Sequence, residues 1–93
     1  MIRGFKNKAT ETVFNGEYAK KINTEIQQRA REKLKYIDAA VSLRDLEVPP
    51  GDRLESPKGN RAGQHSIRIN EQWRICFRWK DKDAFDVEIV DYH

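Results

Sequence analysis

The last three residues of the chain, Asp91-Tyr92-His93, bring together a carboxylate, a phenol and an imidazole. Histidine changes charge near neutral pH, with an ordinary pKa of about 6.5, so His93 can take or give a proton while a nearby aspartate orients its ring. The Tyr92 ring can stack on a nucleobase, and its hydroxyl can bind a phosphate. These residue types suit proton transfer on a nucleic acid, although a frayed chain end can have the same composition.

A second candidate lies in residues 57–63, whose sequence is PKGNRAG. Its two glycines permit a close approach of the backbone, while Lys58 and Arg61 supply positive charge. Such a loop can hold a phosphate backbone, or it can be a glycine-rich turn with incidental charge. It is not a nucleoside-triphosphate P-loop, because no Gly-Lys-Ser or Gly-Lys-Thr is present.

The third candidate is Arg74, which follows Trp73 in a run of alternating apolar and polar residues. If Trp73 packs inward, the planar guanidinium points outward from a strand and can clamp a phosphate through two hydrogen bonds. A cross-strand ion pair with Glu88 or Asp86 explains this arginine equally well. His65, by contrast, shares a face with apolar residues, so we expect a partly buried, structural histidine.

The sequence predicts one domain, residues 1–93, in the cytoplasm. A chain of this length builds a single modest core, and no apolar stretch approaches the length needed to cross a membrane. No secretory signal is recognisable at the start. The two histidines are far apart and Cys76 is the only cysteine, so we expect no disulfide, metal site or cofactor.

Charge is segregated along the chain, whose net charge is +3 from 18 basic and 15 acidic residues. Residues 1–35 carry nine basic and four acidic groups and residues 53–80 carry seven and two, so each segment is +5. Residues 36–52 carry one basic and four acidic groups, a net charge of −3, and residues 81–93 carry one and five, a net charge of −4. Two basic segments that meet in the fold would attract a polyphosphate, whereas a solvated, soluble surface is the plainer explanation.

Helices are expected in the first half of the chain. After a short edge strand at residues 2–5 and a helical turn at 10–14, Asn15-Gly16 breaks the chain. From about residue 17 to 40 apolar residues recur every three or four positions, which only a helix places on one face; they are Ile22, Ile26, Ala30, Leu34, Ile37 and Val41. A capping box at Ser42 and Asp45 then opens one more turn, residues 43–46.

Strands follow in the second half. Residues 65–69 and 73–79 alternate apolar and polar side chains, joined by a tight turn at 70–72, and a turn at 80–83 leads to Phe85, Val87 and Ile89. The expected fold is therefore α+β, with the N-terminal strand and helices packed on one face of an antiparallel sheet. Arg74, Cys76 and Arg78 should then lie on the opposite, more open face.

The order of these motifs resembles the HigB toxins, which are members of the RelE/ParE superfamily paired with HigA antitoxins. The similarity covers nearly the whole chain: IRGF (2–5), LKYIDAAVSLRD (34–45), PPGDRL (49–54), KGNRAGQHSIR (58–68), QWRICF (72–77) and VEIVDYH (87–93). The resemblance implies a metal-independent, ribosome-dependent endoribonuclease that cuts messenger RNA in the ribosomal A site.

By match to the family's motifs, His93 is the candidate general acid or base and Asp91 its partner. Tyr92 is implied to stack on a base or to contact a phosphate, and Arg74 to clamp the scissile phosphate. The resemblance further implies two sets of RNA contacts: Lys58, Arg61 and Arg68 on the RNA backbone, and a basic helix face of Lys20, Lys21, Arg31 and Lys35 on ribosomal RNA.

One position departs from the family, because related toxins carry a histidine where this chain has Glu55. Glu55 can act as a base if its pKa is raised, or it can be a solvated loop carboxylate. Two other activities remain open for this fold, namely poisoning of DNA gyrase, as in ParE, and a catalytically weak RNA- or ribosome-binding regulator.

The implied partners are a HigA-like helix-turn-helix antitoxin, the 70S ribosome and messenger RNA. We expect a toxin that is monomeric when free and part of a hetero-oligomer when neutralised, with no membrane partner.

Overall fold

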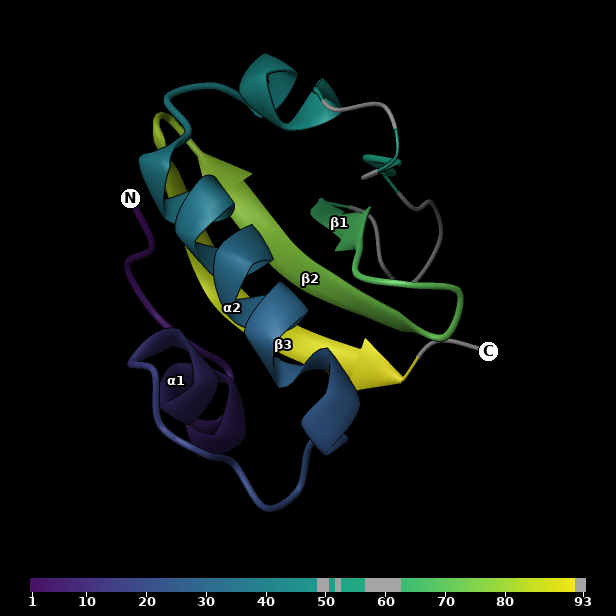
Figure 1. Cartoon of the computed structure of the whole chain (residues 1–93). Helices are drawn as coiled ribbons and strands as arrows, with labels where there is room; N and C mark the ends of the chain where they lie inside the picture. The colour runs from purple at the N-terminus through teal and green to yellow at the C-terminus, as the bar shows by residue number, and fades with distance from the viewer. Residues whose placement is uncertain (49–50, 52, 57–62, 92–93) are drawn as a thin grey trace.

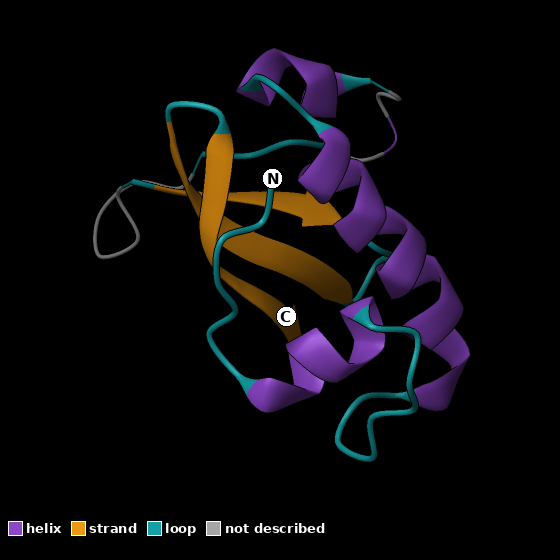
Figure 2. Ribbon diagram, turned by 90° about the vertical axis from the view of Figure 1, so that its left-hand side faces the viewer, coloured by secondary structure: helices purple, strands orange, loops and turns teal. Residues whose placement is uncertain are grey.

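The computed structural model describes residues 1–48, 51, 53–56 and 63–91. The order of elements is α1 (Lys8–Phe14), α2 (Thr24–Ala39), a 3-10 helix η1 (Leu43–Glu47), β1 (Gln64–Arg68), β2 (Trp73–Lys80) and β3 (Asp83–Asp91) (Figure 1). The strands form an antiparallel sheet in the order β1-β2-β3. Figure 2 shows α2 lying along one side of this sheet. The α+β prediction is confirmed.

The long helix is shorter at its start than the apolar pattern predicted. Asn23 caps α2 by accepting a hydrogen bond from the Glu25 amide at 2.8 Å. The Gln27 side chain bonds the backbone of Ala19 and Ile22, which holds the preceding segment in a non-helical path. Ile22 is therefore buried without being helical.

Val41 was wrongly expected on the buried face of that helix. Val41 lies beyond the end of α2 and is 63% exposed. Ala40, the residue that caps the helix, is buried in its stead. The following turn forms as predicted, since the Asp45 carboxylate accepts hydrogen bonds from the backbone amides of Val41 and Ser42. One capping interaction thus both starts η1 and turns Val41 outward.

The N-terminal segment runs beside β3, but it is less regular than the predicted edge strand. It forms two isolated parallel bridges, Ile2 with Ala84 and Phe5 with Val87. The Ile2 amide donates to the Asp38 carboxylate at 2.8 Å, so the segment is also fastened to α2. The apolar pattern correctly predicted that this segment contacts the sheet, but it overestimated the length of the N-terminal strand.

A bulge changes which side chains of β3 reach the core. Cys76 pairs with Glu88 and Arg78 with Phe85, so β3 has an extra residue opposite this part of β2. Asp86 adopts a φ of 51° at this point. Phe85 therefore does not share the face of Val87, and Ala84 is the buried residue beyond the bulge.

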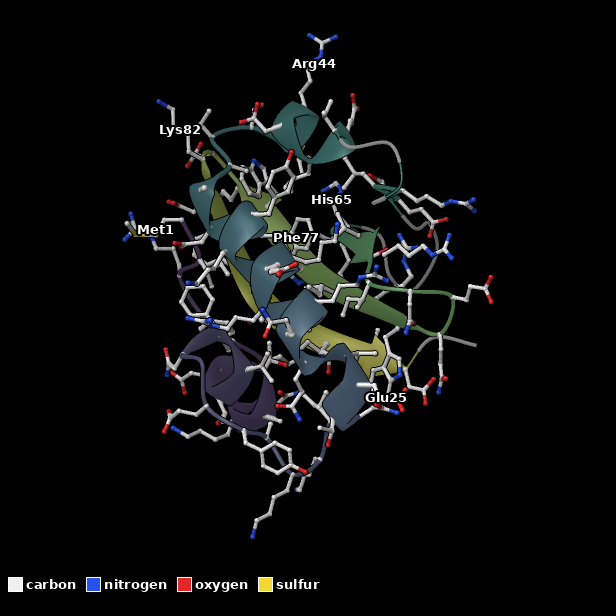
Figure 3. The ribbon with its side chains drawn as sticks, in the orientation of Figure 1. Met1, Glu25, Arg44, His65, Phe77 and Lys82 are labelled. Atoms are coloured by element: carbon white, nitrogen blue, oxygen red, sulfur yellow. The ribbon has the colours of Figure 1, made fainter. Side chains whose placement is uncertain are left out.

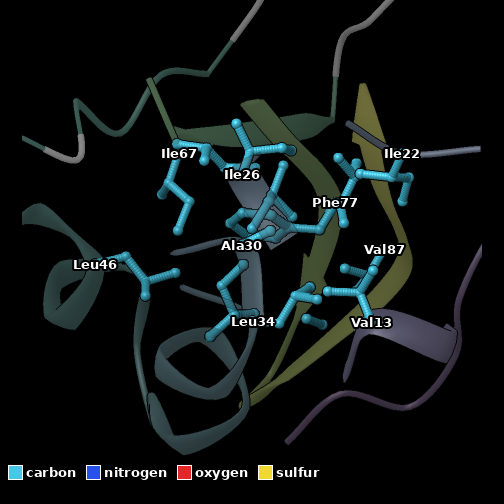
Figure 4. Packing of buried hydrophobic residues seen from close by; sticks show 14 of the residues in the cluster. Val13, Ile22, Ile26, Ala30, Leu34, Leu46, Ile67, Phe77 and Val87 are labelled. Carbon is cyan, nitrogen blue, oxygen red and sulfur yellow. The ribbon is translucent and has the colours of Figure 1, made fainter. Parts of the chain in front are cut away.

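The core fills the space between the helices and one face of the sheet (Figure 4). The predicted α2 residues Ile26, Ala30, Leu34 and Ile37 are all buried there. Ile75 and Phe77 of β2 meet them from the sheet, as the period-two pattern predicted. This face is therefore structural, and the candidate functional groups lie on the other face and at the ends of the strands.

Candidate active site

Arg74 is held rigidly on the sheet face away from α2. Its Nε donates to Ser66 Oγ at 2.9 Å, and its Nη2 donates to the carbonyl oxygens of Arg53 at 2.6 Å and Ser66 at 3.2 Å. Only 7% of the residue is exposed. The expectation that Arg74 and Cys76 lie on an open face is therefore wrong, because both are buried; of the three residues predicted there, Arg78 is the exposed one.

Glu55 supplies the carboxylate next to Arg74. The backbone groups of Glu55 and Ser66 exchange two hydrogen bonds, at 2.9 and 2.8 Å, so residues 53–56 lie beside the outer edge of β1. This pairing brings Glu55 Oε1 to 3.5 Å from Arg74 Nη2. The sheet carboxylates that the sequence offered as ion-pair partners contact other cations.

Glu88 lies 3.8 Å from Lys6 and Asp86 lies 3.6 Å from Arg78. Neither of these ion pairs includes the Arg74 guanidinium, whose carboxylate contact comes from a segment 19 residues earlier in the chain. A cross-strand contact was the natural expectation from strand alternation, whereas the loop that reaches β1 from outside the sheet carried no such pattern.

Arg68 lies directly opposite Arg74 in the register of β1 and β2. Side chains that are directly opposite each other in an antiparallel pair lie on the same face, and two like charges there repel. Both arginines line a hollow of about 370 Å³, called the active-site hollow below, whose described lining residues are Arg53, Glu55, Arg68, Asn70, Glu71 and Arg74. Three cations facing two carboxylates form a site that can bind an anion.

Arg53 was missed by the sequence reasoning. It has a φ of 46°, its carbonyl accepts from Arg74, and its side chain lines the active-site hollow. The only available signal was the alternation of Arg53 and Glu55 about Leu54. Alternation over so few residues does not identify a strand partner.

Asp91 ends β3 and lies directly opposite Trp73. Gln72 Nε2 donates to its carboxylate at 3.1 Å. The register thus places Asp91 on the face of Trp73, and its neighbour Val90 on the face of Arg74. Asp91 and Arg74 are close along the sheet, at the end that carries the β1–β2 turn, but their side chains leave from opposite faces.

Four predicted site residues, Lys58, Arg61, Tyr92 and His93, lie outside the described residues. The basic helix face divides in the structure, because Lys20 and Lys21 precede α2 and line a separate hollow of about 590 Å³ beside Trp73. Lys35 is exposed on α2, whereas Arg31 is half-buried and its guanidinium packs against Gly16. These residues do not form one continuous helical face.

His65 is the partly buried, structural histidine that the sequence predicted. Its Nδ1 lies 2.7 Å from Ser56 Oγ, and its ring packs beside Phe77 (Figure 3). Burial lowers the pKa of His65 below its ordinary value of 6.5, so the neutral ring is favoured. Together with the Glu55 pairing, this contact fixes residues 53–56 against β1.

Among the described residues, no group of three histidine, cysteine or acidic side chains is arranged to hold a metal ion. In the same residues, no helix is long and apolar enough to span a membrane.

Comparison with known proteins gives concordant matches. The family described as "RelE-like toxin of type II toxin-antitoxin system HigB" matches residues 3–93. Toxin HigB-1 of Vibrio cholerae is 38% identical over 87 residues, covering 92% of each chain. Endoribonuclease HigB of Proteus vulgaris is 30% identical over 93 residues, covering 100% of both chains.

Solved structures show the same fold at low sequence identity. YafQ of E. coli aligns with a TM-score of 0.63 at 9% identity, over 98% of this chain and 91% of YafQ. YoeB of Staphylococcus aureus, solved as a dimer, aligns with a TM-score of 0.59 at 20% identity, over 99% of this chain and 97% of YoeB.

Proposed function

Because this chain belongs to the HigB family of RelE-like toxins of type II toxin–antitoxin systems, we propose that it is an endoribonuclease that cuts messenger RNA in the ribosomal A site. The Proteus vulgaris relative, which matches along the whole chain, is named an endoribonuclease. The observation that carries the proposal is the opposed pair Arg68 and Arg74 in the active-site hollow. Two cations held on one face at a distance set by strand pairing suit a phosphodiester.

RNA cleavage by protein groups alone begins when a ribose 2′-hydroxyl attacks the adjacent phosphorus. The bond from phosphorus to the 5′-oxygen breaks, and a 2′,3′-cyclic phosphate remains. One group accepts the proton of the 2′-hydroxyl, another donates a proton to the 5′-oxygen, and cations stabilise the phosphorane between these steps. We assign one proton transfer to His93, with Asp91 as its partner, base stacking to Tyr92, and binding of the scissile phosphate to Arg74.

Glu55 is the candidate for the other proton transfer. Its carboxylate lies 3.5 Å from Nη2 of the Arg74 guanidinium, the cation that we assign to the scissile phosphate. A phosphate entering the hollow would compete for this contact and leave the carboxylate beside the incoming ribose. Glu55 is about half exposed, so it can move without disturbing the core. The catalytic role therefore fits Glu55 better than the role of a solvated loop carboxylate.

The proposal includes contacts outside the reacting groups. Lys58, Arg61 and Arg68 hold the message backbone, while Lys20, Lys21, Arg31 and Lys35 contact ribosomal RNA from two separate surfaces. The free toxin is a cytoplasmic monomer, and a HigA-like helix-turn-helix antitoxin neutralises it in a hetero-oligomer. A structural neighbour, YoeB of Staphylococcus aureus, has been solved in complex with YefM and aligns with a TM-score of 0.58 at 20% identity, over 100% of this chain and 98% of that one.

The deciding experiment is primer extension on a defined message in a reconstituted translation system. Wild-type protein should produce new 3′ ends within ribosome-bound codons, His93→Ala and Arg74→Ala should not, and Arg78→Ala is the matched arginine control. Intact message with wild-type protein would refute the proposal, and inhibition of gyrase supercoiling would then favour a gyrase poison. Equal cleavage by all four proteins would remove the site assignment and leave the activity.

A further inference from the structure

A second basic hollow lies where α2 meets the β1–β2 turn. Its volume is about 460 Å³, and it is lined by Arg29 and Lys33 of α2, Arg68 of β1, and Asn70 and Glu71 of the turn, among others. Neither Arg29 nor Lys33 has a place in the mechanism above. We call this region the α2-edge hollow.

The cations of this hollow come from two elements that are fixed relative to each other. Arg29 and Lys33 lie one helical turn apart, so their side chains are neighbours on the helix surface. Arg29 Nη1 donates to the carbonyl oxygen of Ile69 at 3.5 Å, which directs the guanidinium toward the start of the turn. The turn itself is closed by the Ile69 amide, which donates to the Trp73 carbonyl at 2.9 Å.

The charges of the hollow favour an anion. Arg29 and Lys33 stand at positions i and i+4, where two like charges repel each other. The described lining residues supply three cations, those of Arg29, Lys33 and Arg68, and the carboxylate of Glu71. A bound phosphate would offset this repulsion, whereas a neutral ligand would not.

The α2-edge hollow adjoins the active-site hollow, because the two share lining residues. Both are lined by Arg68, Asn70 and Glu71. Arg68 in turn lies directly opposite Arg74, and it lines both hollows, so the cations follow one another in a line from Arg74 through Arg68 to Arg29 and Lys33 of α2. A chain of phosphates fits such a line better than an isolated anion does.

We propose that the α2-edge hollow binds an RNA phosphodiester outside the scissile one. This inference rests on the proposed ribonuclease function, and it adds Arg29 and Lys33 as binding residues that the family motifs do not identify. The phosphodiester belongs either to the message that continues beyond the cut or to ribosomal RNA beside it, and the two sources share the same recognition chemistry.

The test compares the double variant Arg29→Gln/Lys33→Gln with a control that removes the same charge elsewhere, Arg44→Gln/Lys82→Gln. Figure 3 shows Arg44 and Lys82 toward the end of the molecule opposite Glu25, which is in the first turn of α2. Fluorescence anisotropy measures binding of a fully 2′-O-methylated single-stranded RNA, which supplies no 2′-hydroxyl nucleophile. A second arm measures binding to 70S ribosomes without message.

Each contact to a single strand contributes about 0.7 to the slope of log K against log salt concentration. Losing two contacts should lower the slope by about 1.4 and weaken binding at 0.1 M salt by about 25-fold relative to the control variant. Loss in the oligonucleotide arm identifies the message as the source, and loss in the ribosome arm alone identifies ribosomal RNA; either supports the proposal.

Equal affinities of the two double variants in both arms would overturn the proposal. A third protein, Arg29→Lys/Lys33→Arg, retains both charges and should bind like wild type; if it binds as weakly as the neutral variant, the effect is one of shape and the proposal also fails. Cleavage by the same wild-type preparation is measured in parallel. Its absence would refute the ribonuclease function while the binding arms still report on the hollow.

Discussion

Replacing Arg74 with alanine should destabilise the fold, because this buried arginine fastens residues 53–56 to the sheet. Its two shortest hydrogen bonds, to Ser66 Oγ at 2.9 Å and to the Arg53 carbonyl at 2.6 Å, come from a charged donor. Such bonds contribute about 1.5–3 kcal/mol each. Two of them give roughly 3–6 kcal/mol, part of which is returned because the cation no longer has to be desolvated. We expect the free energy of unfolding to fall by roughly 2–4 kcal/mol.

Urea denaturation followed by tryptophan fluorescence measures this change. With a slope of about 1–1.5 kcal/mol per molar, the midpoint should fall by roughly 2 M. Arg78→Ala is the matched control, since Arg78 is on the same strand but half exposed, with its Asp86 ion pair at 3.6 Å. It should cost at most about 1 kcal/mol. Equal losses in the two variants would refute the view that Arg74 fastens residues 53–56.

Three further predictions concern Glu55, His65 and Gly16. Glu55→Gln should change the free energy of unfolding by less than about 1 kcal/mol, since the Glu55 side chain in its ion pair with Arg74 is half exposed. The same substitution should lower the single-turnover cleavage rate by at least about 100-fold if Glu55 is the base. Normal cleavage would exclude that role. The pKa of His65 in the folded protein lies below its ordinary value of 6.5. Between these two pKa values the unfolded chain binds more protons than the folded protein does. The contribution of His65 to stability is therefore complete above pH 6.5 and is lost as the pH falls through the folded pKa. Unfolding free energies measured from neutral to mildly acidic pH should therefore fall less steeply in His65→Gln than in wild type, and parallel curves would contradict this. Gly16→Ala should lower the free energy of unfolding, measured by thermal unfolding, by more than about 1 kcal/mol. Gly16 has a φ of 84°, and a Cβ there would lie 3.2 Å from the Arg31 guanidinium. An unchanged melting temperature would show that this turn can relax.

The core was predictable because its signals are local. Ile26, Ala30, Leu34 and Ile37 follow one another at helical spacing, and each is buried. Strand alternation likewise placed Ile75 and Phe77 inside, since side-chain direction along a strand depends only on the parity of the position. The β1–β2 turn was also predictable from its residues, because Asn70 Oδ1 accepts hydrogen bonds from the backbone amides of both Gln72 and Trp73.

Parity failed where the backbone departed from a regular strand. The bulge at Asp86 moved Phe85 out of the core face and Ala84 into it. Periodicity also extended the long helix too far toward the N-terminus, because Ile22 is buried through tertiary contacts while Gln27 holds its backbone in a loop. In both cases the periodic pattern is present in the sequence, but a local irregularity of the backbone changed the face or the element to which a residue belongs.

Motifs and short-range periodicity were enough to predict the family, the α+β architecture and the residue types of the candidate chemistry. Three facts came from the folded chain alone: Glu55 lies 3.5 Å from Arg74, Arg68 lies opposite Arg74, and Asp91 leaves the sheet from the other face. Those facts depend on strand register and on a loop pairing with β1. Both are contacts between distant parts of the chain, which no local pattern encodes.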